Sequence, residues 1–380
     1  MQLSFLEPLL GRRGPWATVY FDPAPHDESG AKRRELVVRE ACRRLEEEGA
    51  DTATVQAVGE ALSSVTPQED PAGRVVFAAG GEVVLSCRLS RPPRAPIACW
   101  APLPRLTPLL ELAGEDPLCL VAYIDRTGAD FELRGAAGPE DAGHVEGRQS
   151  PVRRTASADW SERHFQLKVA NTWDHNAGEI AESLRSAFEE SGAEVVVLVG
   201  DVRERPAVLE RLPEAVREVT VATEHGGRAA GSSSPALEEA IEHARREHVQ
   251  RRVDTALDRF RAGRSDTGGP ADAVEGVPAL VAAAQEHRIE TLLIRSDGPE
   301  LATETWAGTA PDQVAVRRTD AQTLGEGDPV AVRADDALLR AAAATAANAL
   351  SLPSTDGERA DVPTGGLGAL LRWTHETSAA

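Results

Sequence analysis

A short basic stretch in an otherwise acidic chain holds the residues with the clearest chemistry. Between His144 and Trp173, five basic side chains stand against three acidic ones, for a local net charge of +2. Four of the five are arginines, whose planar guanidinium groups pair bidentately with phosphate oxygens. The alternative is that the cluster is incidental, because the sequence favours arginine and has lysine only at Lys32 and Lys168. The candidate phosphate-binding residues are Gly147, Arg148, Gln149, Arg153, Arg154, Arg163, His164 and Lys168.

The usual signatures of catalysis, nucleotide binding and metal binding are absent from the sequence. It contains no Gly-x-Gly-x-x-Gly, Walker A or Gly-x-Ser-x-Gly pattern. His243 and His248 are five residues apart, not the four that place two metal ligands on one face of a helix. We therefore expect no cofactor, no metal and no catalytic residue that local spacing reveals.

Charge and cysteine usage restrict the class of protein. The formal net charge is −20, with most of the acidity after residue 175, so a generally basic surface for DNA is excluded. No apolar run approaches the ~20 residues of a membrane span, and the first residues lack a signal peptide pattern. The four cysteines form no Cys-x-x-Cys pair, which favours buried, inert thiols in a reducing cytoplasm.

The basic stretch lies between segments with clear strand and helix patterns. The Gly-bearing polar segment 135–159 is too long for an ordinary connection, so we expect a projecting, functional loop. A helix is predicted over Trp160–Phe188, where Ile180, Leu184 and Phe188 repeat at helical spacing. The apolar run Glu194–Gly200 then predicts a strand buried on both faces.

The remaining elements alternate in the manner of α/β proteins. Strands are predicted over 17–21, 74–78, 82–86, 118–125, 130–134, 217–222, 289–294 and 367–373, and helices over 32–48, 235–261, 276–287 and 335–350. The length favours more than one domain. We expect an α+β N-terminal domain over 1–115, a middle domain over 116–230 with the loop 135–159, and an α/β/α C-terminal domain over 235–380.

Three segments together resemble a known family. Gly365-Gly-Leu-Gly-Ala-Leu-Leu-Arg-Trp373 is similar to the closing strand of archaeal and eukaryotic class-I release factors and Pelota. Glu275–Ile294 resembles the helix and strand of their C-terminal domain. The order of Leu118–Asp125, the long loop and Glu194–Gly200 resembles their ribonuclease-H-like middle domain. Together with Trp16–Asp22 and Asp125–Asp130, these segments are most similar to the actinobacterial branch of the bacterial archaeal-type release factor homologues. That branch is related to the ribosome hibernation factor Balon.

The resemblance implies a three-domain, release-factor-like protein of the cytoplasm that occupies the A site of the 70S ribosome. Its N-terminal domain would face the decoding centre and 16S rRNA, and its middle-domain loop the peptidyl-transferase centre and 23S rRNA. In the branch related to Balon, elongation factor Tu is implied as a further partner.

The loop departs from the family at the position that matters for peptide release. Release factors of the family carry two consecutive glycines and a glutamine that positions water, whereas this chain has Glu146-Gly-Arg-Gln149. Arg148 thus stands at the place of the second glycine, where a positive φ costs a non-glycine residue about 1 to 3 kcal/mol. Hydrolysis is therefore not expected, and Arg148 is expected to contact ribosomal RNA phosphates instead.

Three functions stay open at this level. The first is a ribosome-binding factor of hibernation or stress that blocks the A site without releasing peptide. The second is a peptidyl-tRNA hydrolase for ribosome rescue that uses Gln149. The third is a protein-interaction scaffold that never meets the ribosome.

Overall fold

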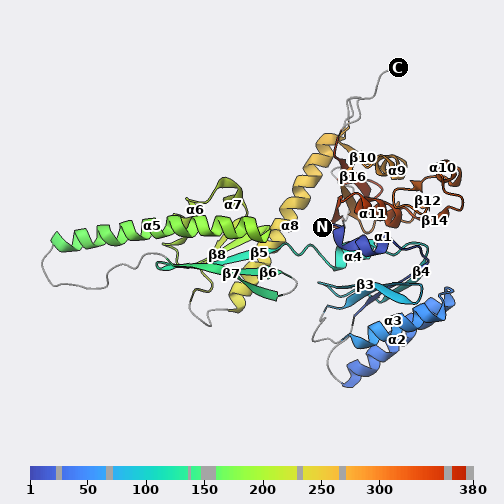
Figure 1. Cartoon of the computed structure of the whole chain (residues 1–380), viewed down its shortest axis with the longest axis horizontal. Helices are drawn as coiled ribbons and strands as arrows, with labels where there is room; N and C mark the ends of the chain where they lie inside the picture. The colour runs from blue at the N-terminus through green and yellow to red at the C-terminus, as the bar shows by residue number, and fades with distance from the viewer. Residues whose placement is uncertain are drawn as a thin grey trace, which may run out of the picture. The chain divides into compact units, whose positions relative to one another are not determined.

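The chain folds into two compact units. The computed structural model describes residues 1–22, 28–65, 72–135, 138–146, 160–228, 234–264, 271–354 and 362–373. Unit 1 joins Met1–Glu115 to Val253–Ala380, and unit 2 is Asp116–Arg252. The described ranges contain helices and four β-sheets, which confirms the mixed α/β class (Figure 1).

Unit 2 is built on one mixed sheet with the strand order β7-β6-β5-β8-β9. Its first three strands in chain order are antiparallel neighbours, and β8 and β9 continue parallel to β5. This is the arrangement expected for the ribonuclease-H-like middle domain. The strands are β5 (Cys119–Asp125), β6 (Gly128–Gly135), β7 (Gly138–Glu146), β8 (Val195–Val199) and β9 (Thr220–Thr223).

Apolar side chains cover both faces of this sheet. Helix α5 (Trp160–Ser191) packs on one face through Ile180 and Leu184, with α6 (Arg205–Leu209) and α7 (Glu214–Glu218) beside it. Helix α8 (Pro235–Gly263) covers the other face through Leu237 and Ile241. All five residues of β8 are buried, as the run of valines predicts for a strand covered on both sides.

The N-terminal part of unit 1 is a four-stranded antiparallel sheet with the order β3-β2-β1-β4. The strands are β1 (Trp16–Phe21), β2 (Arg74–Ala79), β3 (Glu82–Arg88) and β4 (Ile97–Ala101). Helices α2 (Glu28–Glu47) and α3 (Thr52–Ser64) pack on one face, and α1 (Glu7–Leu10) and α4 (Thr107–Leu112) on the other (Figure 1). The sequence predicted β1, β2, β3 and α2, but neither α3 nor β4.

The C-terminal part of unit 1 has the expected three layers. Its main sheet has the order β10-β16-β11-β15, with the end of α8 on one face and α9 (Val277–Gln285) and α11 (Ala334–Ala344) on the other. The strands are β10 (Ala273–Glu275), β11 (Ile289–Arg295), β15 (Asn348–Leu352) and β16 (Leu367–Leu371). A smaller sheet contains β12 (Glu304–Ala307), β13 (Val314–Ala315) and β14 (Val330–Arg333), beside α10 (Arg318–Thr323).

The helix predicted over 335–350 is wrong in its second half. Helix α11 ends at Ala344, Ala346 has a φ of 52°, and Asn348–Leu352 form β15. Pairing of β15 with the buried strand β11 outweighs the helix propensity of the alanines.

The first and last parts of the chain share one hydrophobic cluster in unit 1. The division into three domains therefore stays a prediction. The structure adds that Pro235–Arg252 of α8 belong to unit 2 and its remaining residues to unit 1.

Two buried carboxylates at the start of α11 hold these two parts of unit 1 together. The Asp335 carboxylate accepts a hydrogen bond from Thr107 Oγ1 at 2.9 Å, and Asp336 Oδ1 accepts one from the Leu106 backbone N–H at 3.0 Å. Arg105 lies 3.3 Å from Asp336 Oδ2. Burial, together with the neighbouring Asp335 charge, raises the pKa of Asp336 well above 3.8, and Arg105 opposes that shift.

We expect Asp336→Asn and Asp336→Ala to differ in stability. Asn keeps an acceptor for the Leu106 N–H and ends the repulsion between Asp336 and Asp335, while Arg105 keeps the Asp335 carboxylate nearby, so the loss in the free energy of unfolding should stay at about 1 kcal/mol. Ala leaves that buried N–H without an acceptor and should cost about 2 to 3 kcal/mol. Denaturant unfolding of both variants measures the difference, and equal losses would contradict this role of Asp336.

The same carboxylate should make stability depend on pH. Because the folded-state pKa of Asp336 lies above 3.8, the folded protein keeps this proton to higher pH than the unfolded chain. The resulting contribution to the free energy of unfolding is fully present below 3.8 and is lost as the pH rises through the folded-state pKa. Asp336→Asn should remove this part of the slope in a pH series of unfolding curves. A wild-type-minus-variant difference that is flat with pH would contradict it.

Candidate functional site

The predicted site residues follow the end of β7. Gly147, Arg148, Gln149, Arg153 and Arg154 lie outside the described residues, and Arg163, His164 and Lys168 lie within α5. The structure defines the two ends of the segment that contains them. Strand β7 ends at Glu146, and α5 begins at Trp160.

The prediction of a loop over 135–159 is wrong in its first part. Residues Gly138–Glu146 form β7, which pairs antiparallel with β6 from Gly135↔Gly138 to Gly128↔Glu146. The pairing shifts register next to Phe131, and Asp141 Oδ1 accepts a hydrogen bond from the Gly143 N–H at 2.9 Å. A polar edge strand with such an irregularity lacks the apolar alternation that reveals strands in a sequence.

The turn between β5 and β6 is held by one carboxylate. Asp125 Oδ1 accepts hydrogen bonds from the Thr127 N–H at 2.7 Å, the Thr127 hydroxyl at 2.7 Å and the Gly128 N–H at 2.9 Å. Burial alone would raise the pKa of Asp125, but the hydrogen bonds from Thr127 and the nearby Arg228 outweigh it and lower the pKa. This aspartate therefore stays ionised and fixes the turn.

Arg228 clamps the same turn from a distant part of the chain. Its Nε and Nη2 donate to the two carboxylate oxygens of Asp130 at 2.9 and 3.1 Å, and its Nη1 lies 3.2 Å from Asp125 Oδ1. Two-point pairing of this kind fixes the direction of the guanidinium as well as its distance. The residue opposite Glu146 in the sheet, Gly128, lies inside this clamped turn.

Helix α5 is fixed to the turn as well. The buried Asn176 donates from Nδ2 to the Arg126 carbonyl oxygen at 2.9 Å, and Arg126 Nε lies 3.1 Å from Glu204 Oε1. Trp173 is the first α5 residue whose side chain the structure describes, and it packs against the core. Since each helical residue rises about 1.5 Å, Trp160 lies about 20 Å along the helix from Trp173. Figure 1 shows this first part of α5, in green, extending past the strands of the sheet.

Sequence reasoning missed Arg228 and Asn176 as supports of the site. Asp130 and Arg228 are 98 residues apart, so no local spacing links them. The strands predicted over 118–125 and 130–134 lie on either side of this turn, and the Asp-x-Thr-Gly pattern with its side-chain acceptor is the signal that points to Asp125.

The other groups considered for chemistry have ordinary partners. His175 Nε2 lies 3.1 Å from Glu179 one helical turn away, and His243 Nε2 lies 3.3 Å from Glu247. No cluster of potential metal ligands occurs in the described part of the chain. Burial raises the pKa of Cys99 to about 11 and that of Cys119 to about 12, so these thiols stay protonated at neutral pH. No helix among the described residues is long and apolar enough to cross a membrane.

Gly128 offers a test of the geometry at the base of the segment. A Cβ at this position would lie 2.0 Å from the Val145 carbonyl oxygen, so Gly128→Ala should disturb the β6–β7 pairing and cost about 2 kcal/mol or more in the free energy of unfolding. Gly227→Ala is the matched control, because nothing lies within 4 Å of its Cβ position. Equal stabilities of the two variants in denaturant unfolding would contradict the close approach of β7.

Comparison with known proteins places this arrangement in a family. The model of "Bacterial archaeo-eukaryotic release factor family 2" matches residues 118–266, which hold most of unit 2 and all of α8. The Mycobacterium tuberculosis protein Rv2629 is 30% identical over 386 aligned positions, covering 98% of this chain and 97% of that protein.

Solved structures of translation factors are also similar, at low identity. An archaeal translation termination factor, aRF1, is 16% identical over 97% of this chain and 95% of its own, with a TM-score of 0.23. An archaeal Pelota in a model of ribosome-bound Pelota and ABCE1 is 16% identical over 80% of this chain and 78% of its own, with a TM-score of 0.40. At these TM-scores the structures add nothing to the assignment, which rests on the family model and the full-length relative: the chain belongs to the bacterial archaeo-eukaryotic release factor family 2.

Proposed function

We propose that the protein binds the ribosome and that the segment 147–159, with the start of α5, is its contact to ribosomal RNA. Membership of a release factor family supports a role in translation. The observation that carries the proposal is the place of the local basic segment. The segment begins where β7 ends, beside the clamped turn. It leads into the part of α5 that extends past the strands of the unit 2 sheet (Figure 1).

Charge supports the same assignment. RNA phosphates repel a protein of net charge −20 unless a local basic surface makes the contact. Arg148, Arg153 and Arg154 lie in the segment itself and add three positive charges there. The acidic remainder of the chain suits contacts with protein partners, and elongation factor Tu is the partner that we propose to test first.

At a finer level, we propose that the protein occupies the A site, touching 16S and 23S rRNA, and does not release peptide. Arg148 replaces a residue that release chemistry requires to be glycine, and its guanidinium fills space that a water molecule would need. An A site filled in this way is closed to tRNA, which is the action of a hibernation or stress factor in the cytoplasm.

The arginines of the segment should dominate ribosome affinity. Replacing Arg148, Arg153 and Arg154 with Ala should weaken binding to 70S ribosomes at least about tenfold and reduce the slope of log K against log salt by about 2 to 3. The control replaces Arg203, Arg217 and Arg246, three exposed arginines elsewhere in unit 2, and removes the same charge. Co-sedimentation over a salt series measures both. A segment variant that binds no more weakly than the control would refute the role of the segment.

Peptide release separates the proposal from ribosome rescue. We expect saturating protein to release no labelled peptide from stalled ribosomes, because the loop lacks the second glycine. Peptide release above the background measured without protein would show a peptidyl-tRNA hydrolase instead, if Gln149→Ala abolishes that release and Gln313→Ala keeps it. Gln313 is a fair control because it lies in unit 1, far along the chain from the segment.

A further inference from the structure

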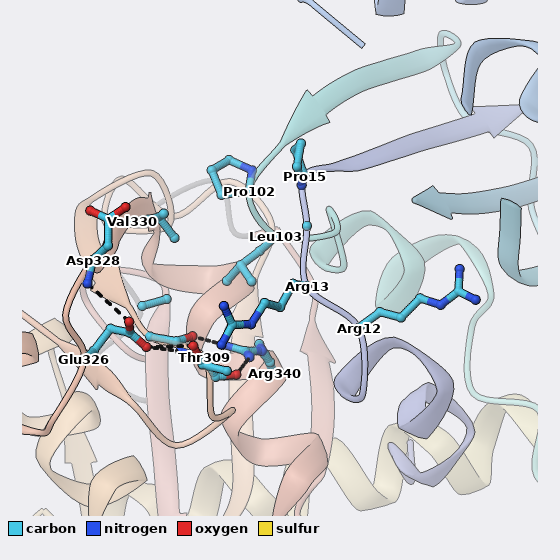
Figure 2. Close-up of a pocket in the computed structure, with 13 residues that line it drawn as sticks. Arg12, Arg13, Pro15, Pro102, Leu103, Thr309, Glu326, Asp328, Val330 and Arg340 are labelled. Carbon is cyan, nitrogen blue, oxygen red and sulfur yellow. Dashed lines mark hydrogen bonds between the residues drawn. The ribbon is translucent and has the colours of Figure 1, made fainter. Parts of the chain in front are cut away.

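Unit 1 contains a cavity of about 360 Å³ that the proposed ribosome contact does not use. Its wall combines residues from before β1 and after β4 with residues of the small C-terminal sheet and α11 (Figure 2). Pro15, Pro102, Leu103 and Val330 form an apolar side. A cavity of this size is in the range that holds a small organic ligand.

One cation of the cavity is buried without an acidic partner. Arg340 on α11 is only 7% exposed, and its Nη1 and Nη2 donate to the carbonyl oxygens of Gly308 and Thr309 at 3.0 and 2.5 Å. No carboxylate of the described residues forms an ion pair with it. Burial lowers the pKa of Arg340, which the charge of Asp312 partly offsets. Asp312 itself has a partner, since its Oδ2 lies 3.1 Å from His287 Nε2.

A second cation lies on the same cavity. The structure gives Arg13 no ion pair with any described residue, and Figure 2 shows its side chain directed toward Thr309 and Arg340. Arg12 next to it turns the other way, where its Nη2 lies 2.5 Å from Glu82 Oε2 and its Nη1 donates to the Ala79 carbonyl oxygen. Two guanidinium groups therefore share one cavity without a carboxylate paired to either.

The two carboxylates that line the cavity have partners of their own. Glu326 Oε2 accepts hydrogen bonds from the Thr309 N–H at 2.7 Å and hydroxyl at 2.8 Å, and Oε1 accepts one from the Asp328 N–H at 3.2 Å. The hydrogen bond from the Thr309 hydroxyl, those from the Thr309 and Asp328 N–H groups and the nearby Arg13 charge together lower the pKa of Glu326. The Asp328 carboxylate lies 3.8 Å from Arg318. The acids thus hold the loops of the cavity wall, and neither of them forms an ion pair with Arg13 or Arg340, although the Arg13 charge acts on Glu326 from a longer distance.

We propose that this cavity binds the phosphate or carboxylate group of a small organic molecule between Arg13 and Arg340, with its apolar part against Leu103 and Val330. Guanidinium groups recognise both oxyanions through paired N–H donors, and three of the five N–H groups of Arg340 carry no hydrogen bond to a described residue. A bound anion would also relieve the unfavourable burial of the Arg340 charge.

Calorimetric titration of the full chain at low salt tests the site. The probes are AMP for a phosphate, succinate for a carboxylate, and adenosine as the uncharged match to AMP. We expect at least one of the two anions to bind and adenosine not to bind. Binding of AMP alone would identify a phosphate site, and binding of succinate alone would identify a carboxylate site. If neither anion binds at concentrations up to about 10 mM, the proposal is overturned.

Two neighbouring arginines provide matched variants. Arg13→Gln should weaken binding of the anion about tenfold or more, the loss expected for a charged hydrogen-bond donor, whereas Arg12→Gln should change it less than about twofold. Arg13 is exposed, so its replacement leaves the fold intact, and circular dichroism checks this. Equal effects of the two variants would overturn the proposal. Ribosome co-sedimentation should be unchanged in Arg13→Gln, which keeps this test separate from that of the segment.

Discussion

The backbone pairing between Gly128 and Glu146 is the constraint on which the proposed site depends. This pairing fixes the end of β7. Gly128 lies in the turn that Asp125 and Arg228 hold through charged hydrogen bonds. The segment leads into α5, which Asn176 ties to the same turn further along the helix. Because both flanking elements are held by unit 2, the basic residues between them start and finish at defined points of the fold. This is how a protein with a large negative charge can direct one positive segment at RNA.

Unit 1 depends on buried polar groups of a different kind. A single helix, α11, carries the acidic pair Asp335 and Asp336 at its start and Arg340 one turn further on. Arg333 pairs with Asp335 from the C-terminal part itself. Arg105, Leu106 and Thr107 also contact the acidic pair, and these contacts join the N-terminal part of the chain to the C-terminal part. Arg340 forms no ion pair with a carboxylate of the described residues. The same helix therefore provides both a closed polar contact and a buried cation that the charge of Asp312 offsets only in part.

The sequence predicted those elements whose signals are local. The run of valines in β8 and the apolar repeat of α5 were sufficient for their elements. It failed where pairing with a distant strand decides the structure. Strand β7 has polar side chains and an irregular register, and β15 continues from an alanine-rich helix. The supports of the site were hidden for the same reason, since Arg228 reaches Asp130 only in the folded unit. The candidate residues at 147–154 lie outside the described residues, so their role stays a prediction.

The central claim is that the arginine-bearing segment touches ribosomal RNA in the A site. Cryo-electron microscopy of the protein on vacant 70S ribosomes tests it most directly. We expect density for the protein in the A site, with Arg148 and Arg153 against phosphates of 23S rRNA and no tRNA beside it. Density at another place on the ribosome, or a bound protein whose segment 147–159 points away from RNA, would contradict the account.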